Sequence, residues 1–431
     1  MKQYELFEDS SPDREQISLE ELFEAYYQCR RNKRRTVNAL AFELDFEREL
    51  IQLWHEINSG RYKIGRSIAF VVQDPVQREV FAASFRDRVV HHLVIAKLNP
   101  LFEEEFIGSS YSCREGKGTL FGVRDVRDMI TACSEAGGRD CYILKLDIKS
   151  FFMSIDKVIL YQMLAAFIEE KYHQPDKRIV LRLVRQIVFE CPEDNCVIKG
   201  KRADWNGLPC DKSLFWSNRR CGLPIGNLTS QIFANFYLNR LDKFVTEELG
   251  IRYYGRYVDD FVLIDTDKRV LTAARKKIGE FLQTELHLTL HPRKTYLQHY
   301  SKGVRFIGAV IKPNRIYIGK RSKNNLYKKI YRQLPLMAKS VRSTLEGLEP
   351  FAACVNSYIG FMRHYNTFRL RYHILSLLEQ SFLGEVIDVA PQAVKISVNK
   401  MFRSAAMRRR KLRQQRQYRR WLLEQRRKGE S

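Results

Sequence analysis

The chain has 431 residues, of which 45% are hydrophobic, so it can form two or three domains with substantial cores. Its 74 Lys and Arg residues outnumber its 50 Asp and Glu residues, and the net charge of +24 favours polyanionic partners, nucleic acid first and an anionic membrane surface second. No apolar stretch reaches the roughly 18 residues of a transmembrane helix, and the N-terminus lacks the apolar core of a signal peptide. We therefore expect a cytoplasmic protein without a membrane partner.

The N-terminal part of the chain predicts helices. Residues 1–16 are polar, and we expect them to be flexible. Ser18 is followed three residues later by Glu21, a capping-box pattern, and the apolar spacing after it predicts an amphipathic helix. Residues 46–60 predict a second helix that ends at its terminal glycine.

The next segments predict a strand and a further helix. Residues 63–74 alternate in the manner of a strand, and residues 85–102 have the spacing of a helix that ends at Pro100. His91 and His92 within this helix invite a metal-site interpretation, but adjacent helical residues point about 100° apart. We favour one histidine in the packed face and one at the surface.

The middle of the chain combines a strand, a helical stretch and an irregular segment. Residues 141–148 predict a buried strand with Asp147 at its end, and the chain from there to Glu190 is largely helical. Residues 191–221 predict an inserted loop or small subdomain, called the 191–221 insertion below. Free thiols are favoured over a zinc site for its four cysteines, whose spacing matches zinc motifs poorly: Cys191, Cys196, Cys210 and Cys221.

Two adjacent carboxylates, Asp259 and Asp260, lie inside the apolar, strand-like run YVDDFVLI. Buried carboxylates are unfavourable unless they are paired, protonated or bound to metal. At a tight hairpin turn they would protrude together, and Asp147 could lie beside them; three such charges repel one another unless cations neutralise them. Hard oxygen ligands suit Mg²⁺, so we expect a metal site; the alternative is a surface turn, in which Asp is common.

The C-terminal part of the chain is mostly helical in pattern. Residues 269–286 predict an amphipathic helix, residues 304–320 a strand pair, and residues from about 320 to 390 mostly helix. The tail from Lys400 to Ser431 holds 13 Lys and Arg residues and 2 acids. Its charge predicts a basic helix or arm that either binds RNA or a partner or is simply solvated.

From about residue 20 to residue 315 the sequence resembles the bacterial reverse transcriptases. Five motifs in the family's order carry the resemblance: KLDIKSFFMSID, LPIGNLTSQ, YVDD, HPRKT and VRFIGAVI. The resemblance implies an α+β, right-hand polymerase fold of fingers, palm with an antiparallel sheet, and helical thumb, followed by a basic tail. It also implies an RNA-directed DNA polymerase that uses two Mg²⁺ ions, for which Mn²⁺ can substitute.

The resemblance assigns roles to particular residues. Metal binding is implied for Asp147, Ile148, Asp259 and Asp260, and Lys294 is implied as the proton donor to the departing pyrophosphate. Nucleotide binding is implied for Arg78, which suits the triphosphate, and for Ile148, Phe152, Ile225, Gly226 and Gln231. Phe152 is the candidate steric gate that crowds a ribose 2′-OH; the alternative is a core phenylalanine.

The template–primer is expected to contact Asn227, Asn235 and Gly308, the last of these in the primer-grip hairpin. Asn227, Gln231, Asn235 and Asn239 recur every four residues on one helix. This amide face either reads a template–primer groove or is solvated. The partners implied are an RNA template and primer, dNTPs, the cDNA product and an accessory RNA-binding protein.

The resemblance also predicts the order of domains along the chain. It gives a flexible N-terminus (1–16), N-terminal helices and fingers (17–135), a palm containing the insertion (136–312), a helical thumb (313–395) and a basic tail (396–431).

Ile225 and Gln231 depart from the Gln and Pro that retroviral and group II intron enzymes usually carry at these places. The pattern IGNLTSQ resembles reverse transcriptases of diversity-generating retroelements. Ile225 removes a hydrogen-bonding amide from the nucleotide pocket, so we expect low fidelity. The alternatives are an antiphage-defence reverse transcriptase and a maturase-like RNA-binding protein.

Overall fold

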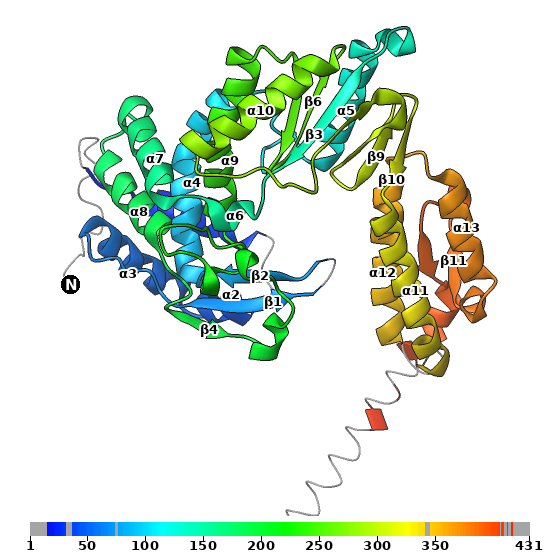
Figure 1. Ribbon diagram of the computed structural model, residues 1–431. Coiled ribbons are helices and arrows are strands. Elements are labelled where there is room, and N and C mark those ends of the chain that lie inside the picture. The colour runs from blue at the N-terminus through cyan, green and yellow to red at the C-terminus, as the bar shows by residue number, and fades with distance from the viewer. Residues whose placement is uncertain are drawn as a thin grey trace, which may run out of the picture. The chain divides into compact units, whose positions relative to one another are not determined.

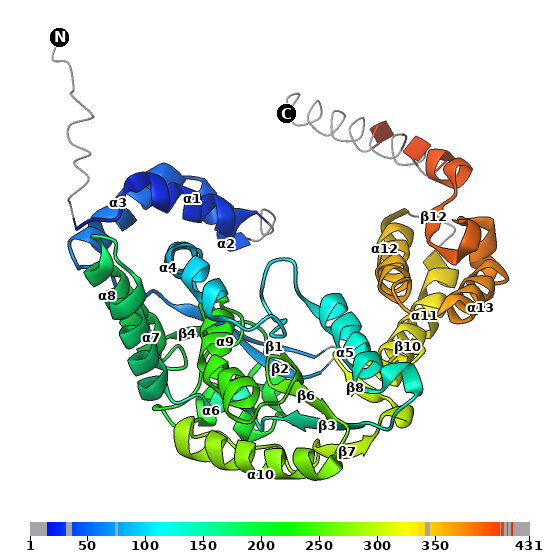
Figure 2. The ribbon, with the colours of Figure 1, turned by 90° about the horizontal axis from the view of Figure 1, so that it is seen from above.

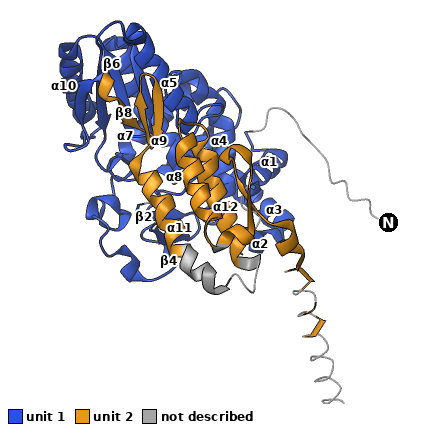
Figure 3. Ribbon diagram, turned by 90° about the vertical axis from the view of Figure 1, so that its right-hand side faces the viewer, with its two compact units in different colours: residues 1–300 blue, residues 301–431 orange. Residues whose placement is uncertain are grey.

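The computed structural model describes residues 15–31, 37–73, 76–340 and 345–405, together with residues 407, 408, 412, 415 and 416. The chain divides into two compact units, residues 1–300 and residues 301–431, and each is described by itself (Figure 3). Most of the flexible N-terminus and most of the basic tail that we expected lie outside the described residues. Among the described residues, no helix is long and apolar enough to cross a membrane.

The first unit opens with helices. They are α1 (Leu19–Arg30), α2 (Val37–Glu43), α3 (Phe46–Asn58) and α4 (Phe85–Glu105), and α1 packs along α4. The predicted capping box is confirmed, because the Ser18 hydroxyl accepts a hydrogen bond from the Glu21 backbone and the Glu21 carboxylate accepts one from the Ser18 backbone. Reciprocal capping of this kind satisfies two otherwise unpaired backbone donors at the helix start.

The prediction that a helix ends at Pro100 was wrong. Helix α4 continues to Glu105 with Pro100 inside it. Proline removes one backbone hydrogen bond, to the carbonyl four residues earlier. That residue, Ala96, is exposed, so water can satisfy its carbonyl, while Leu98 and Phe102 on either side of the proline are buried and hold the helix in place.

The first unit also contains a small sheet of order β2-β1-β4, whose strands β1 and β2 come between α3 and α4 in the chain (Figure 1). Strands β1 (Ser67–Val72) and β2 (Arg78–Ala82) are antiparallel, and β4 (Cys196–Ile198) pairs with β1 in parallel. Strand β4 belongs to the 191–221 insertion, which otherwise contains short 3₁₀ helices. The insertion is therefore part of this sheet and not only an irregular loop.

The central sheet has four antiparallel strands in the order β5-β6-β3-β7. These are β3 (Tyr142–Asp147), β5 (Tyr253–Tyr257), β6 (Asp260–Asp265) and β7 (Tyr296–His299). Helix α10 (Lys268–Glu285) packs against β3, β6 and β7, and α5 (Thr119–Cys133) packs against β5 and β6. Strand β3, which ends at Asp147, thus pairs with a strand on each side, β6 and β7.

Helix α9 (Leu228–Lys243) runs beside α4 (Figure 2) and belongs to the same hydrophobic core as the sheet. Its apolar side chains are largely buried, including Ile232, Phe236 and Tyr237. The remaining helices of this unit are α6 (Phe151–Ser154), α7 (Lys157–Lys171) and α8 (Lys177–Phe189).

The second unit opens with three strands, where we predicted a pair. They are β8 (Val304–Phe306), β9 (Ala309–Lys312) and β10 (Arg315–Ile318), in the order β10-β9-β8. The chain reverses twice, once at Ile307 and Gly308, which both have positive φ, and once before Arg315. Helices and a hairpin complete the unit: α11 (Lys320–Ser340), α12 (Leu345–Met362), α13 (Phe368–Glu379), β11 (Ile387–Val389) and β12 (Ile396–Val398).

Gly255 on β5 tests the packing of the central sheet. A Cβ atom there would lie 2.4 Å from the hydroxyl oxygen of Tyr111, a fully buried residue. We expect Gly255→Ala to lower the free energy of unfolding by about 1–3 kcal/mol through overpacking, as measured by chemical denaturation. The control is Gly279→Ala on α10, where the nearest atom to a new Cβ is 3.6 Å away and about 0.5–1 kcal/mol of stabilisation is expected. Equal denaturation midpoints for the two variants would contradict this packing.

Candidate active site

The three carboxylates predicted at strand ends converge at one edge of the central sheet. Asp147 is the last residue of β3 and pairs in register with Asp260, the first residue of β6. Asp259 lies in the turn immediately before Asp260, and its backbone carbonyl accepts a hydrogen bond of 3.1 Å from the Ile148 backbone. These three acids, called the carboxylate cluster below, are thereby held on adjacent strand ends.

The turn that carries Asp259 has an unfavourable backbone conformation. Val258 has a φ of 56°, in the left-handed region that β-branched residues rarely adopt. The Val258 carbonyl accepts a hydrogen bond of 3.1 Å from the Arg256 guanidinium. A strained conformation persists only where its surroundings fix it, and this hydrogen bond is one of the contacts that do so.

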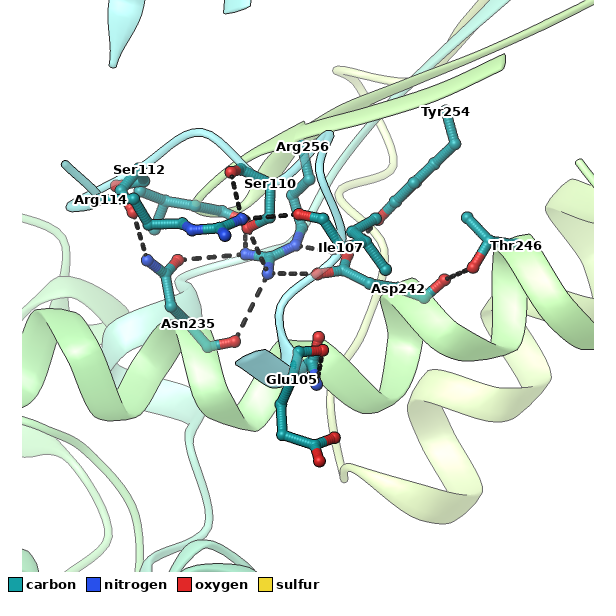
Figure 4. A network of polar contacts seen from close by, with 12 residues as sticks. Glu105, Ile107, Ser110, Ser112, Arg114, Asn235, Asp242, Thr246, Tyr254 and Arg256 are labelled. Carbon is teal, nitrogen blue, oxygen red and sulfur yellow. Dashed lines mark hydrogen bonds and ion pairs between the residues drawn. The ribbon is translucent and has the colours of Figure 1, made fainter. Parts of the chain in front are cut away.

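Arg256 belongs to a fully buried ion pair (Figure 4). Its guanidinium donates to both carboxylate oxygens of Asp242 on α9, at 2.6 and 2.5 Å, and the Tyr254 hydroxyl donates to Asp242 at 2.7 Å. Burial lowers the pKa of Arg256, but the Asp242 carboxylate raises it by more than burial lowers it. The pKa of Arg256 thus lies above its ordinary value. The Arg256 guanidinium therefore keeps its positive charge in the core.

The same guanidinium also reaches α9 and the loop after α4 (Figure 4). It donates to the side-chain oxygen of Asn235 at 3.3 Å and to the Ser110 hydroxyl at 3.2 Å. The Asn235 amide in turn donates to the Ser112 carbonyl at 2.5 Å. One side chain thus connects the turn of the carboxylate cluster to α9 and to a distant loop, and double hydrogen bonding of this kind fixes orientation as well as distance.

The carboxylate cluster is electrostatically unfavourable on its own. Burial and the charge of Asp147 raise the pKa of Asp259 to about 6. Burial also raises the pKa of Asp260 to about 6, although Lys145 on β3 opposes this from 2.6 Å. Lys294 contacts both oxygens of Asp147, at 2.9 and 3.0 Å. Asp259 and Asp260 therefore hold protons more tightly than ordinary carboxylates, and a nearby cation would favour their charged forms.

The carboxylate cluster offers oxygen ligands of the kind that divalent metal ions bind. Across the described ranges, no three His, Cys, Asp or Glu side chains gather closely enough to hold one ion by themselves. However, Mg²⁺ is usually bound by one or two carboxylates together with substrate phosphates and waters. The hard oxygen donors of the carboxylate cluster and their raised pKa values fit such a partial site. The four cysteines considered for zinc form no such group either.

The candidate nucleotide-binding residues lie on several elements. Phe152 on α6 and Ile225 before α9 are half-buried and pack against the same small hydrophobic cluster. Gly226 has a φ of 125°, and a Cβ there would lie 2.8 Å from Val80, so only glycine fits. Arg78 is exposed at the start of β2, and in the described part of the chain no hydrogen bond or ion pair joins it to the carboxylate cluster.

The amide face expected to meet template–primer is not an open surface. Asn227, Asn235 and Asn239 are buried, and they bond to the backbones of Ala83, Ser112 and Glu105, respectively. The amides satisfy backbone groups of neighbouring segments that would otherwise be unpaired in the core. Gln231 is exposed, and the Cys113 thiol donates to its side-chain oxygen at 3.1 Å. Gly308 lies in the second unit, in the turn between β8 and β9.

Three residues at this site were not predicted from the sequence: Lys145, Asp242 and Arg256. Lys145 and Arg256 are charged residues inside otherwise apolar strands, the same signal that pointed to Asp259 and Asp260. Asp242 gave no signal, because an acid on a helix is ordinary in sequence and only the structure shows it to be fully buried.

Comparison with known proteins identifies the class. Residues 77–311, more than half of the chain, match the model of the family described as reverse transcriptase (RNA-dependent DNA polymerase), and the chain belongs to this family. Its enzyme class is RNA-directed DNA polymerase, a nucleotidyltransferase. Members of the family normally use divalent metal ions and bind RNA templates.

Particular relatives are distant. Protein YkfC of Escherichia coli (strain K12) is 24% identical over 306 residues, which cover 63% of this chain and 73% of that protein. Apo telomerase from Candida tropicalis, truncated from its C-terminal domain, has a TM-score of 0.43 at 16% identity, covering 59% of this chain and 55% of that chain. Telomerase from Candida albicans with a fragment of telomeric RNA has a TM-score of 0.43 at 14% identity, covering 75% and 61%.

Replacing Arg256 with Met tests the buried pair. The variant leaves the Asp242 carboxylate in the core without its ionic partner, so we expect the free energy of unfolding to fall by about 3–5 kcal/mol in chemical denaturation. The double variant Arg256→Met/Asp242→Leu should recover part of this loss, because no unpaired charge remains. The control Arg240→Met breaks the surface pair with Glu285 and should cost about 1 kcal/mol or less. An Arg256→Met loss no larger than that of the control would contradict the role of the pair.

Proposed function

We propose that this chain is a reverse transcriptase that copies an RNA template into cDNA at the carboxylate cluster. The observation that carries the proposal is the convergence of Asp147, Asp259 and Asp260 at one sheet edge. Membership of the reverse transcriptase family agrees with it. A maturase-like protein that only binds RNA would not need three acids whose burial and mutual repulsion are unfavourable.

In the proposed mechanism Asp147 and Asp259 offer carboxylate oxygens, and Ile148 its backbone carbonyl, to two Mg²⁺ ions, for which Mn²⁺ can substitute. Asp260 supports them, held by its ion pair with Lys145. When bound, the ions activate the attacking oxygen of the primer and stabilise the leaving oxygen. Lys294, whose ammonium lies 2.9 Å from Asp147, is the proposed donor of a proton to the departing pyrophosphate.

Residues around this centre select the incoming nucleotide in the proposal. Arg78 binds the triphosphate with its guanidinium fork, and Phe152 crowds the ribose 2′-OH, so that dNTPs are preferred over rNTPs. Ile225, Gly226 and Gln231 border the nascent base pair. A contact of Gly308 with the primer is proposed from the family resemblance alone, whereas the buried Asn227 and Asn235 position the protein's own backbone.

The fold is assigned to the right-hand architecture under the same proposal. The β2-β1-β4 sheet and the N-terminal helices form the fingers, the central sheet forms the palm, and α11, α12 and α13 form the thumb. The basic tail adds affinity for RNA through its charge, which predicts salt-dependent binding.

The proposed biological role is cDNA synthesis by a low-fidelity enzyme of a bacterial retroelement, most like those of diversity-generating retroelements. The sequence IGNLTSQ supports this role, and antiphage defence is the alternative. Neighbouring genes separate the two: a variable-protein gene with repeats favours the retroelement, and a cluster of defence genes favours defence.

Primer extension on an RNA template with Mg²⁺ and dNTPs tests the proposed activity. We expect Asp259→Asn to reduce extension by on the order of a hundredfold or more, because an amide does not replace the charge of the carboxylate. The control Asp194→Asn, at an exposed acid in the 191–221 insertion, should extend normally. Extension that depends neither on Mg²⁺ nor on Asp259 would sink the proposal.

The same variant has an opposite effect on stability. Because burial raises the pKa of Asp259 from 3.8 to about 6, the folded state binds a proton more tightly, and metal-free stability falls as pH rises between these values. In metal-free buffer above pH 6, Asp259→Asn should raise the free energy of unfolding by about 1–2 kcal/mol. This gain shows that lost extension is not lost folding.

Ile225→Gln tests the fidelity proposal. The variant restores an amide that can hydrogen-bond in the nucleotide pocket, so we expect misincorporation opposite template adenine to fall by about tenfold. Sequencing of cDNA made on a mixed-sequence RNA template measures this, with wild type as reference and Ile225→Leu as a control that keeps an apolar residue. An error rate equal in all three proteins would contradict the link between Ile225 and fidelity.

A further inference from the structure

The 191–221 insertion is fixed to strand β2 by a buried carboxylate. Glu79 is 1% exposed, and it accepts hydrogen bonds from the Trp205 indole at 2.7 Å, the Ser213 hydroxyl at 2.6 Å and the Leu214 backbone at 2.6 Å. Each bond to a charged acceptor is stronger than a neutral one, and three of them satisfy this carboxylate well. Glu79 directly follows the arginine proposed to bind the triphosphate.

The insertion also shares a hydrophobic cluster with the proposed nucleotide pocket. The buried members of this cluster come from three parts of the chain: Ala69, Phe81, Met153, Trp205, Leu208 and Leu214. Phe152 and Ile225 pack against it as half-buried side chains, and so does Phe215 of the insertion. Phe215 lies 5.3 Å from the ring of Phe81, whose backbone N–H donates to the Ile225 carbonyl at 2.9 Å. The insertion therefore shares packing contacts with both Phe152 and Ile225.

A polar contact joins the insertion to the segment that leads into Phe152. The Ser150 hydroxyl donates to Asp211 at 2.8 Å, and the Lys149 ammonium lies 3.8 Å from the same carboxylate. Ser150 has a φ of 48°, a left-handed conformation that is unfavourable for serine and needs a fixed environment. This residue lies between Asp147 and Phe152, directly before helix α6.

We infer that the 191–221 insertion is a wall of the nucleotide pocket and that Asp211 is a positioning residue for sugar selection. Asp211 holds Ser150, and with it the backbone that aims the Phe152 ring at the ribose. The inference rests on the proposed polymerase function and adds a residue to its specificity. Asp211 acts through Ser150 and Phe152, so it does not itself touch the nucleotide.

Sugar selection depends on the stiffness of the gate. A steric gate rejects a 2′-OH only if its ring cannot move aside. A positioned side chain needs support from the residues around it. The contact to Asp211 and the cluster packing supply that support from two directions.

The test compares the kcat/KM for dCTP with that for CTP on one template. We expect Asp211→Ala to lower the ratio by about tenfold, while Asp211→Asn, which keeps an acceptor for the Ser150 hydroxyl, retains most of it. In a Phe152→Ala background, where the gate is already absent, Asp211→Ala should change the ratio no further. An Asp211→Ala enzyme with wild-type selectivity would overturn the inference.

Two measurements guard against trivial explanations. Asp194→Ala removes another acid of the insertion, which is paired with Arg219 at the surface, and it should leave the ratio unchanged. Asp211 has a side chain that is 46% exposed, so the thermal unfolding midpoint of Asp211→Ala should stay close to that of wild type. If Asp211→Ala and Asp194→Ala both lost sugar selectivity and both had a much lower thermal unfolding midpoint, the local positioning role of Asp211 would be overturned.

Hydrogen exchange separates this inference from the proposed function. Asp211→Ala should speed amide exchange in residues 149–155, which contain helix α6, without affecting the central sheet, whether or not the protein extends a primer. If the wild type makes no product, the proposed function fails, and the exchange data still decide whether Asp211 holds this segment. Unchanged exchange overturns the inference even in an active enzyme.

Discussion

The buried ion pair between Arg256 and Asp242 is the interaction on which the site depends. Both side chains are inaccessible to water, so their charges are tolerated only because two short hydrogen bonds join them and further polar groups surround them. The same guanidinium holds the Val258 carbonyl and thereby the strained turn that presents Asp259.

The carboxylate cluster places mutually repelling acids at the edge of a well-packed sheet. Burial raises the pKa of Asp259 and Asp260 to about 6, and the nearby charge of Asp147 adds to both increases. Lysines relieve part of the repulsion: Lys145 pairs with Asp260, and Lys294 pairs with Asp147. Burial of these acids lowers stability at this edge of the sheet, and under the proposed function a bound divalent cation would offset that cost.

Sequence patterns located the acids because a charge inside an apolar strand has few structural explanations, and strand ends are readable from the apolar run itself. The same reasoning extends to Lys145 and Arg256. The amide face of α9 shows the limit of reasoning from sequence patterns. A period of four places Asn227 and Asn235 on one side of a helix, but the period does not reveal the loop and strand that cover these side chains. Those contacts join segments more than 100 residues apart in the chain. The structure of the 191–221 insertion also depends on distant contacts of this kind, so the sequence did not predict its place beside β1 and β2.

A structure of the protein with an RNA template, a DNA primer, a non-reacting dNTP analogue and Mn²⁺ tests the central claim most directly. The account predicts anomalous peaks for two ions within about 2.2 Å of carboxylate oxygens of Asp147 and Asp259, with Arg256 still paired to Asp242. It also predicts that Lys294 has moved away from Asp147 toward the phosphates. Ordered nucleotide with Mn²⁺ bound elsewhere, or with no ion at these acids, would contradict the assignment of the active centre.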